Sequence, residues 1–157
     1  SEKPYSSKQD IYSHNDIPTF SDDDINQYLW GKFHWNGSLS TRKRRDSIEM
    51  LFRFNDDKTR KHLIQVTAQG SYCLFESMGA EKDNVKKLTA ERLLNLTWLR
   101  NRNIDLVEFI VDANDCLTGR TLHPLSSMGF EEFAFSAYML AVESDRLEYL
   151  IKEPDEY

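Results

Sequence analysis

Four histidines are the side chains of this chain best suited to acid–base chemistry or metal binding. They are widely spaced and fall in different predicted elements: His14, His34, His62 and His123. None has a cysteine or carboxylate beside it at the spacing of a known metal-ligand motif, and the zinc-protease pattern HExxH is absent. We therefore predict exposed or hydrogen-bonded histidines and no metal ion.

The other motifs that could carry chemistry are incomplete. Asp112 and Asn114 have the spacing that opens a calcium loop, but Leu117 stands where that loop needs glycine. The glycines form no phosphate-binding loop, and no serine lies in a GxSxG turn. Glu108 interrupts an apolar run, and an edge position or a neighbouring Lys or Arg is the simplest explanation. The sequence predicts no catalytic residue and no cofactor.

A dense basic cluster is formed by Arg42, Lys43, Arg44 and Arg45, which we place in an exposed loop. The chain as a whole is acidic, with 20 Lys and Arg against 26 Asp and Glu and a formal net charge of −6. This balance argues against a nucleic-acid-binding face and against attraction to anionic membranes. We expect the cluster to dock an acidic protein segment, such as the C-terminal helix of a second copy.

The length of 157 residues and the 39% hydrophobic content are typical of one globular domain. Polar residues 1–20 predict a flexible N-terminal arm, residues 21–153 the domain, and residues 154–157 a short tail. No apolar run approaches the roughly 20 residues that a membrane-spanning helix needs. We therefore expect no membrane partner.

Cysteine usage bears on the compartment. Cys73 and Cys116 form no CxxC motif, and the printed N-terminus carries no apolar signal-peptide stretch. Two buried thiols in a reducing cytoplasm explain this pattern, and a single disulfide between them stays open as an alternative. We predict a cytoplasmic protein.

The N-terminal half predicts one helix and three strands. Ser21 and the three aspartates after it mark the start of a helix that continues to Phe33, and a loop follows as far as Asp46. Apolar residues then alternate with polar ones in three runs joined by short turns, Ser47–Phe54, His62–Ala68 and Ser71–Met78. These runs predict an antiparallel meander.

The C-terminal half predicts a helix, a two-stranded hairpin and a final helix. Thr89 begins the first helix, Ile104–Val111 and Cys116–His123 are the strands, and Phe130–Ile151 has apolar residues at a 3-4 repeat. The expected class is α+β: helix, three strands, helix, two strands, helix, with a five-stranded antiparallel sheet covered by helices on one face.

The helix that begins at Thr89 is apolar around most of its circumference, which predicts burial on more than one side. We expect Leu96 or Leu99 to be accessible in a monomer and covered in a homodimer. Trp98 and Trp35 are expected to be exposed aromatic anchors for a partner. Edge strands of the sheet could add an extended segment by main-chain pairing.

About two thirds of the chain resembles the YbjN family, which is classed with type III secretion chaperone-like proteins. The resemblance is carried by four segments: Leu88–Leu96, the hairpin Val107–Leu122, Gly129–Phe133 and Leu147–Ile151. It implies a homodimeric chaperone-like α+β fold that binds protein segments without chemistry, and the YbjN branch is also associated with regulation. No family site residues transfer to this chain.

We predict from these features a non-enzymatic protein-binding module, chaperone-like or regulatory, that holds a protein segment on hydrophobic surface as a homodimer. Two alternatives stay open. One is a small ligand-binding domain or enzyme with a pocket between sheet and helix, around Glu108 and His62. The other is an immunity or inhibitor protein whose acidic surface neutralises a basic toxin.

Overall fold

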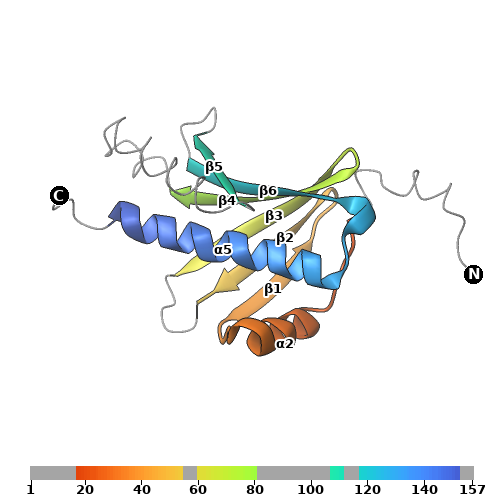
Figure 1. Cartoon of the computed structure of the whole chain (residues 1–157), viewed down its shortest axis with the longest axis horizontal. Helices are drawn as coiled ribbons and strands as arrows, with labels where there is room; N and C mark the ends of the chain where they lie inside the picture. Colours follow the sequence, from red (N-terminus) through yellow and green to blue (C-terminus); the bar gives the residue numbers. More distant parts are fainter. Residues whose placement is uncertain (1–16, 55–59, 81–106, 112–116, 153–157) are drawn as a thin grey trace, which may run out of the picture.

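The computed structural model describes residues 17–54, 60–80, 107–111 and 117–152 (Figure 1). These residues form an antiparallel sheet of six strands in the order β1-β2-β3-β4-β6-β5, together with helices that pack on it. The elements are α2 (Asp22–Phe33), β1 (Ser38–Lys43), β2 (Ser47–Arg53), β3 (Lys61–Gln69), β4 (Tyr72–Ala80), β5 (Glu108–Val111), β6 (Leu117–Pro124), the 3-10 turn η2 (Leu125–Ser127) and α5 (Phe130–Lys152). The predicted α+β class is confirmed.

The described helices pack toward the same side of the sheet. Helix α5 runs across the sheet over β3, β4 and β6, while α2 lies beside β1 and touches α5 (Figure 1). We call the side facing α5 the inner face and the opposite side the open face. Among the elements that the structure describes, no helix lies on the open face.

The predicted loop up to Asp46 was wrong, because Ser38–Lys43 forms strand β1 at the edge of the sheet. The sheet therefore has six strands, and the meander has four. The strand escaped prediction because an edge strand with one polar side lacks the apolar alternation of a central strand. Only Leu39 is fully buried in it.

The inner face holds the core, as the alternation in β2 and β3 predicted. The buried apolar side chains of these strands are Ile48, Met50, Phe52, Ile64, Val66 and Ala68. Helix α5 meets them with its predicted apolar stripe, in which small residues such as Ala137 and Ala141 allow close approach. Gly119 of β6 is needed under this helix, because a Cβ atom there would lie 2.6 Å from the Phe109 ring.

Cys73 of β4 also faces the core as a free, buried thiol. Burial raises the pKa of this thiol to about 12. A thiol that stays protonated is no nucleophile, so Cys73 acts as a small apolar group. Cys116, its possible disulfide partner, lies outside the described residues.

The start of the domain agrees with the predicted helix cap but not with the predicted arm. The Ser21 side chain accepts a hydrogen bond of 3.3 Å from the Asp24 backbone nitrogen, which confirms the cap. Ile17 is buried, and the Phe20 ring packs against α5 through Phe130 and Phe133. Residues 17–20 therefore belong to the packed domain rather than to the arm.

Several predictions fall on residues that the structure does not describe. These are most of the N-terminal arm, the helix from Thr89 with Leu96, Trp98 and Leu99, the turn between β5 and β6, and the tail. No helix within the described ranges is both long enough and apolar enough to cross a membrane.

Candidate functional site

A row of mostly charged side chains crosses the open face from one edge of the sheet to the other. The strand register places its members opposite one another in the order Arg42, Glu49, Gln65, Glu76, Arg120 and Glu108. Opposite charges at facing positions stabilise a sheet. The exposed Glu108 carboxylate lies 3.2 Å from Arg120 Nε, which confirms the expectation of a neighbouring basic residue.

Apolar side chains lie on both sides of this charged row. Leu51 faces Leu63 across β2 and β3, and Leu74 faces Leu122 across β4 and β6. Leu63 is 50% exposed and Leu122 is 53% exposed, and the Tyr72 side chain near the end of β4 is exposed as well. The open face therefore presents two leucine pairs to solvent, separated by the charged row.

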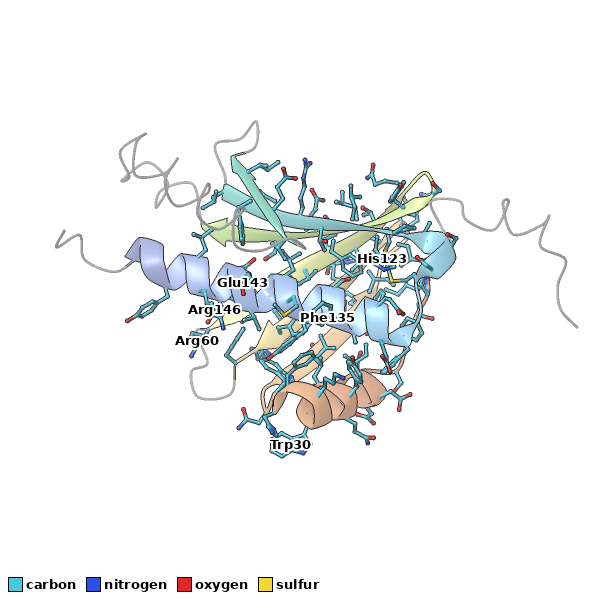
Figure 2. The ribbon with its side chains drawn as sticks, viewed as in Figure 1. Trp30, Arg60, His123, Phe135, Glu143 and Arg146 are labelled. Carbon is cyan, nitrogen blue, oxygen red and sulfur yellow. The ribbon has the colours of Figure 1, made fainter. Side chains whose placement is uncertain are left out.

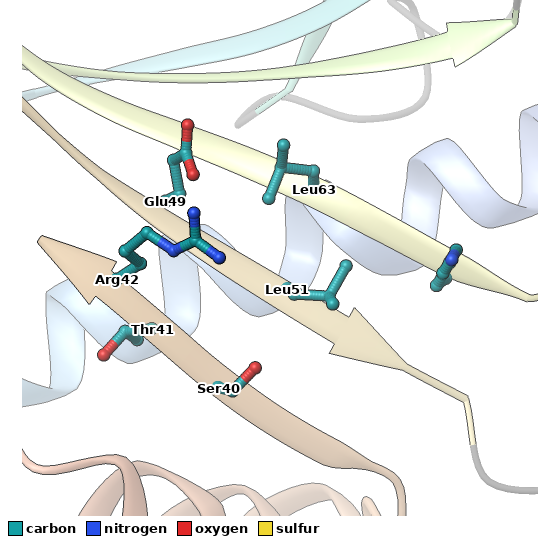
Figure 3. Close-up of a pocket in the computed structure, with 7 residues that line it drawn as sticks. Ser40, Thr41, Arg42, Glu49, Leu51 and Leu63 are labelled. Carbon is teal, nitrogen blue, oxygen red and sulfur yellow. The ribbon is translucent and has the colours of Figure 1, made fainter. Parts of the chain in front are cut away.

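One leucine pair forms part of an open depression at the β1 side of the sheet (Figure 3). The depression has a volume of about 530 Å³, and the residues that line it are Ser40, Thr41, Arg42, Glu49, Leu51, Lys61 and Leu63. The Arg42 side chain points from β1 toward β2 (Figure 3). The Glu49 carboxylate is paired with Arg44 Nε at 3.2 Å. Arg42 and Lys61 thus leave positive charge beside an apolar patch.

The basic cluster predicted as one loop is divided by the strand. Arg42 and Lys43 are consecutive residues of β1, so their side chains point to opposite faces of the sheet. Arg44 pairs with Glu49, and Arg45 is exposed in the turn to β2. Of the four residues, Arg42 is the one that lines the depression.

Trp35 does not serve as the exposed anchor that we expected. It is 7% exposed and packs edge-on against the rings of Phe52 and Phe54. The residue follows the left-handed turn at His34 that ends α2, and this turn directs the chain back onto the core. The exposed tryptophan in this region is Trp30 of α2 (Figure 2).

The free edge of β1 is not available for main-chain pairing over its middle part. The Asn26 side chain accepts a hydrogen bond from the Leu39 backbone nitrogen and donates one to the Leu39 carbonyl, each at 3.2 Å. The Asp22 carboxylate accepts hydrogen bonds from the Thr41 backbone nitrogen at 3.1 Å and from the Thr41 hydroxyl at 2.7 Å. Side chains of α2 therefore occupy backbone groups that an added strand would need.

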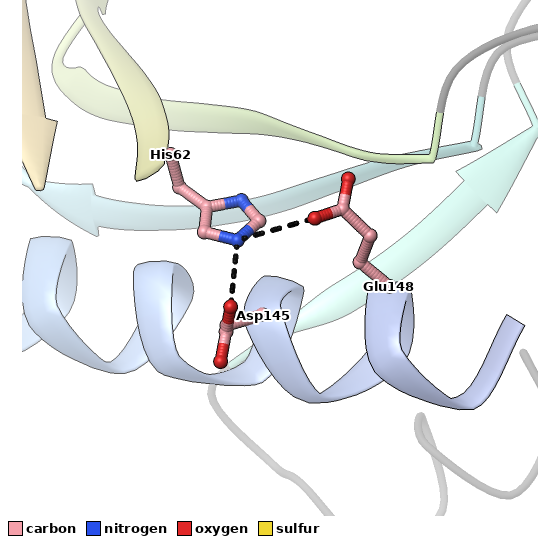
Figure 4. A group of neighbouring side chains, drawn as sticks. All are labelled: His62, Asp145 and Glu148. Carbon is pink, nitrogen blue, oxygen red and sulfur yellow. Dashed lines mark hydrogen bonds and ion pairs between the residues drawn. The ribbon is translucent and has the colours of Figure 1, made fainter. Parts of the chain in front are cut away.

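A second group of polar residues lies on the inner face, where the start of β3 meets the C-terminal half of α5 (Figure 4). His62 Nε2 lies 3.1 Å from Asp145 Oδ1 and 3.7 Å from Glu148 Oε1. Arg60 Nη2 donates to Asp145 Oδ2 at 2.6 Å. The prediction of a hydrogen-bonded histidine is confirmed for His62.

This inner-face group was missed from the sequence as a group. Its one signal was Asp145 and Glu148, which stand three residues apart and so lie on the same side of the predicted helix. The alternative pocket around Glu108 and His62 was wrong, because Glu108 lies on the open face and His62 on the inner face.

The electrostatics of this group depend on Asp145. Partial burial raises the pKa of the Asp145 carboxyl, but the hydrogen bonds from His62 and Arg60 and the charges of these groups outweigh that effect. The pKa falls to about 2 from a usual value of 3.8. The folded protein therefore stabilises the ionised carboxylate.

Acid is expected to remove at most about 2 kcal/mol of stability through Asp145, corresponding to its pKa shift. Because the folded pKa is depressed, this stabilisation is fully present above the unfolded pKa near 4 and is lost as the pH falls through about 2. Urea unfolding of the parent and of Asp145→Asn at about pH 5 and about pH 2 measures the effect. The difference in stability between the two proteins is expected to shrink at the lower pH; an unchanged difference would contradict the prediction.

Comparison with known proteins assigns no family to the chain, because no protein-family model and no curated protein matches it. What the chain binds is therefore inferred from the two groups of residues described above.

Proposed function

We propose that the chain is a non-enzymatic binding module that holds an extended segment of another protein on the open face of its sheet. The observation that carries this proposal is the exposure of two leucines, Leu63 and Leu122, one from each leucine pair, on a face that no described helix covers. Single exposed leucines are ordinary, but apolar patches that border a depression are typical of interaction sites.

Charge indicates which segment would fit. The depression combines an apolar floor, Leu51 and Leu63, with two basic side chains, Arg42 and Lys61. Its carboxylate, Glu49, is already paired with Arg44. The positive charge of Arg42 and Lys61 stands out on a chain of net charge −6 and favours a partner with local negative charge. The proposed partner is an extended segment with an apolar residue next to Asp or Glu.

The family resemblance and the cytoplasmic location predicted from the sequence are part of this proposal too. A YbjN-like, chaperone-like or regulatory role in the cytoplasm agrees with a module that binds protein segments. The homodimer predicted from Leu96 and Leu99 stays a prediction. Pairing at the middle of β1 is not part of the proposal, because α2 occupies that edge.

Selection of random short peptides displayed on phage, with the full chain immobilised, tests the proposal. The expected consensus places an apolar residue beside an acidic one. For a selected peptide followed by fluorescence anisotropy, Leu63→Asp is expected to weaken binding by at least about tenfold, because it puts a charge on the apolar floor.

Trp30→Asp is the matched control, because Trp30 is an equally exposed apolar residue on the helix side (Figure 2). It is expected to leave the affinity unchanged, whereas Arg42→Glu is expected to abolish the preference for acidic peptides. The proposal fails if no peptide is selected, or if Leu63→Asp and Trp30→Asp weaken binding equally.

A further inference from the structure

We propose that His62, Asp145 and Glu148 bind a divalent transition-metal ion, with Zn²⁺ as the ion that fits best. The three side chains converge from β3 and α5, and one potential ligand atom from each lies within 4.8 Å of the other two (Figure 4). This site is separate from the open face and independent of the proposed protein-binding function.

The donor set favours a transition metal over Mg²⁺ or Ca²⁺. Zn²⁺ accepts both imidazole nitrogen and carboxylate oxygen as ligands, whereas the harder ions prefer oxygen alone. The side chains of His62, Asp145 and Glu148 are 3%, 13% and 25% exposed. The histidine is thus fixed within the core, while the Glu148 side of the group is open to solvent and to an incoming ion.

The distances between the ligand atoms agree with tetrahedral coordination. Nitrogen and oxygen ligands at roughly 2.0–2.2 Å from Zn²⁺ lie roughly 3.3–3.6 Å from one another in a tetrahedron. His62 Nε2 lies 3.1 Å from Asp145 Oδ1 and 3.7 Å from Glu148 Oε1. All three ligand atoms lie within 4.8 Å of one another, so closing the three corners requires the two carboxylates to move toward each other by up to about 1 Å, and water would supply the fourth ligand.

Arg60 orients the Asp145 carboxylate in this arrangement. Its shorter hydrogen bond, 2.6 Å from Nη2, goes to Oδ2, while a longer one of 3.3 Å from Nε goes to Oδ1, the oxygen that also lies 3.1 Å from His62 Nε2. The Arg60 guanidinium also lies 4.8 Å from the centre of the Phe54 ring, which holds it on the outer side of the group. Carboxylate ligands of metals are commonly supported by such an outer hydrogen bond.

Metal binding would use the neutral imidazole with its proton on Nδ1, so that Nε2 carries a lone pair. In the metal-free protein the same Nε2 is positioned to donate to Asp145. The ion would therefore replace a hydrogen bond between β3 and α5 with coordinate bonds. The competing interpretation is that His62, Asp145 and Glu148 bind no metal ion and only hold β3 and α5 together.

Titration of the chelator-treated full chain with Zn²⁺ alone, by isothermal titration calorimetry near neutral pH, distinguishes the two interpretations. The expected result is one site per chain, a rise in melting temperature on Zn²⁺ addition, and no such rise with Mg²⁺. Glu148→Gln is expected to weaken this site by at least about tenfold, since even groups outside the coordination sphere contribute that much. Co²⁺ is expected to give the visible absorption of a four-coordinate site, which this variant loses.

Matched controls remove the same chemical groups elsewhere. Glu131→Gln changes an exposed carboxylate of α5, and His123→Gln changes a histidine of β6. Both are expected to bind Zn²⁺ like the parent, whereas His62→Gln is expected not to. The proposal is overturned if the parent binds no stoichiometric Zn²⁺, or if Glu148→Gln binds it as tightly as Glu131→Gln does. Because Glu148 is partly exposed, its variant keeps the test valid even if His62→Gln unfolds the protein.

Discussion

Replacing Ile64 with alanine is expected to lower the free energy of unfolding by about 3 kcal/mol, whereas Leu63→Ala is expected to cost less than about 1 kcal/mol. Leucine and isoleucine side chains are isomers, and these two lie at adjacent positions of β3, so each truncation removes the same number of carbon atoms. Ile64 is 0% exposed on the inner face, and Leu63 is 50% exposed on the open face. The first change leaves a cavity under α5, and the second does not.

Urea unfolding followed by tryptophan fluorescence measures both variants, because the buried Trp35 packs against Phe52 in the same core. Equal losses of stability would show that the open face is packed as tightly as the inner face. The expected difference would show that Leu63 contributes little to the fold of the isolated chain. A leucine of that kind is available for a partner, which is what the proposed function requires.

The double variant Asp22→Ala with Asn26→Ala is expected to lower the free energy of unfolding by about 3 kcal/mol. The side chains of Asp22 and Asn26 make four hydrogen bonds to Leu39 and Thr41 of β1. The two bonds from Thr41 go to the charged carboxylate of Asp22. Their removal leaves backbone groups of β1 without side-chain partners. We also expect this variant to self-associate through the freed edge, as uncovered edge strands tend to do.

The control for this double variant is Asp23→Ala with Gln27→Ala, which makes the corresponding truncations at the next positions of α2. Both control residues are exposed. We expect the control to lose about 1 kcal/mol or less, from the acidic first turn of the helix, and to remain at the oligomeric state of the parent. Light scattering over a range of concentrations, combined with urea unfolding, measures both effects. Similar behaviour of the two double variants would show that α2 does not protect the edge of β1.

These predictions separate two roles of one sheet. The inner face and the α2-capped edge hold the domain together, while the open face has exposed leucines and uneven charge. Natural sheets often keep one face for the core and leave the other to solvent or to a partner. The depression beside Arg42 and Lys61 lies on this open face.

Local periodicity in the sequence was sufficient to predict the long helix α5, the strands β2 and β3 with their buried faces, and the Ser21 cap. Each of these depends on residues a few positions apart, so the pattern and its cause lie in the same short segment. The α+β class followed from the order of such segments.

Strand β1 and the burial of Trp35 depended on tertiary structure. The free edge of β1 is satisfied by Asn26 and Asp22, which belong to a helix earlier in the chain and bond the backbone of Leu39 and Thr41. An edge strand that pairs with β2 on one side and is bonded by helix side chains on the other buries few of its own side chains, so its sequence resembles that of a loop. The division of the basic cluster follows from the same strand, because neighbouring side chains of a strand point to opposite faces.

The contact between His62 and Asp145 shows most clearly what local sequence patterns cannot predict, because 83 residues separate the two in the chain. The sequence by itself predicted that His62 lies in a strand and that Asp145 lies in the long C-terminal helix. Only the packing of α5 on β3 decided that the two meet, because periodicity shows which side of an element is buried and not which residue lies against it. The hydrogen bonds and charges of His62 and Arg60 then lowered the pKa of Asp145 in spite of its partial burial, and the same packing brought Glu148 close to both His62 and Asp145.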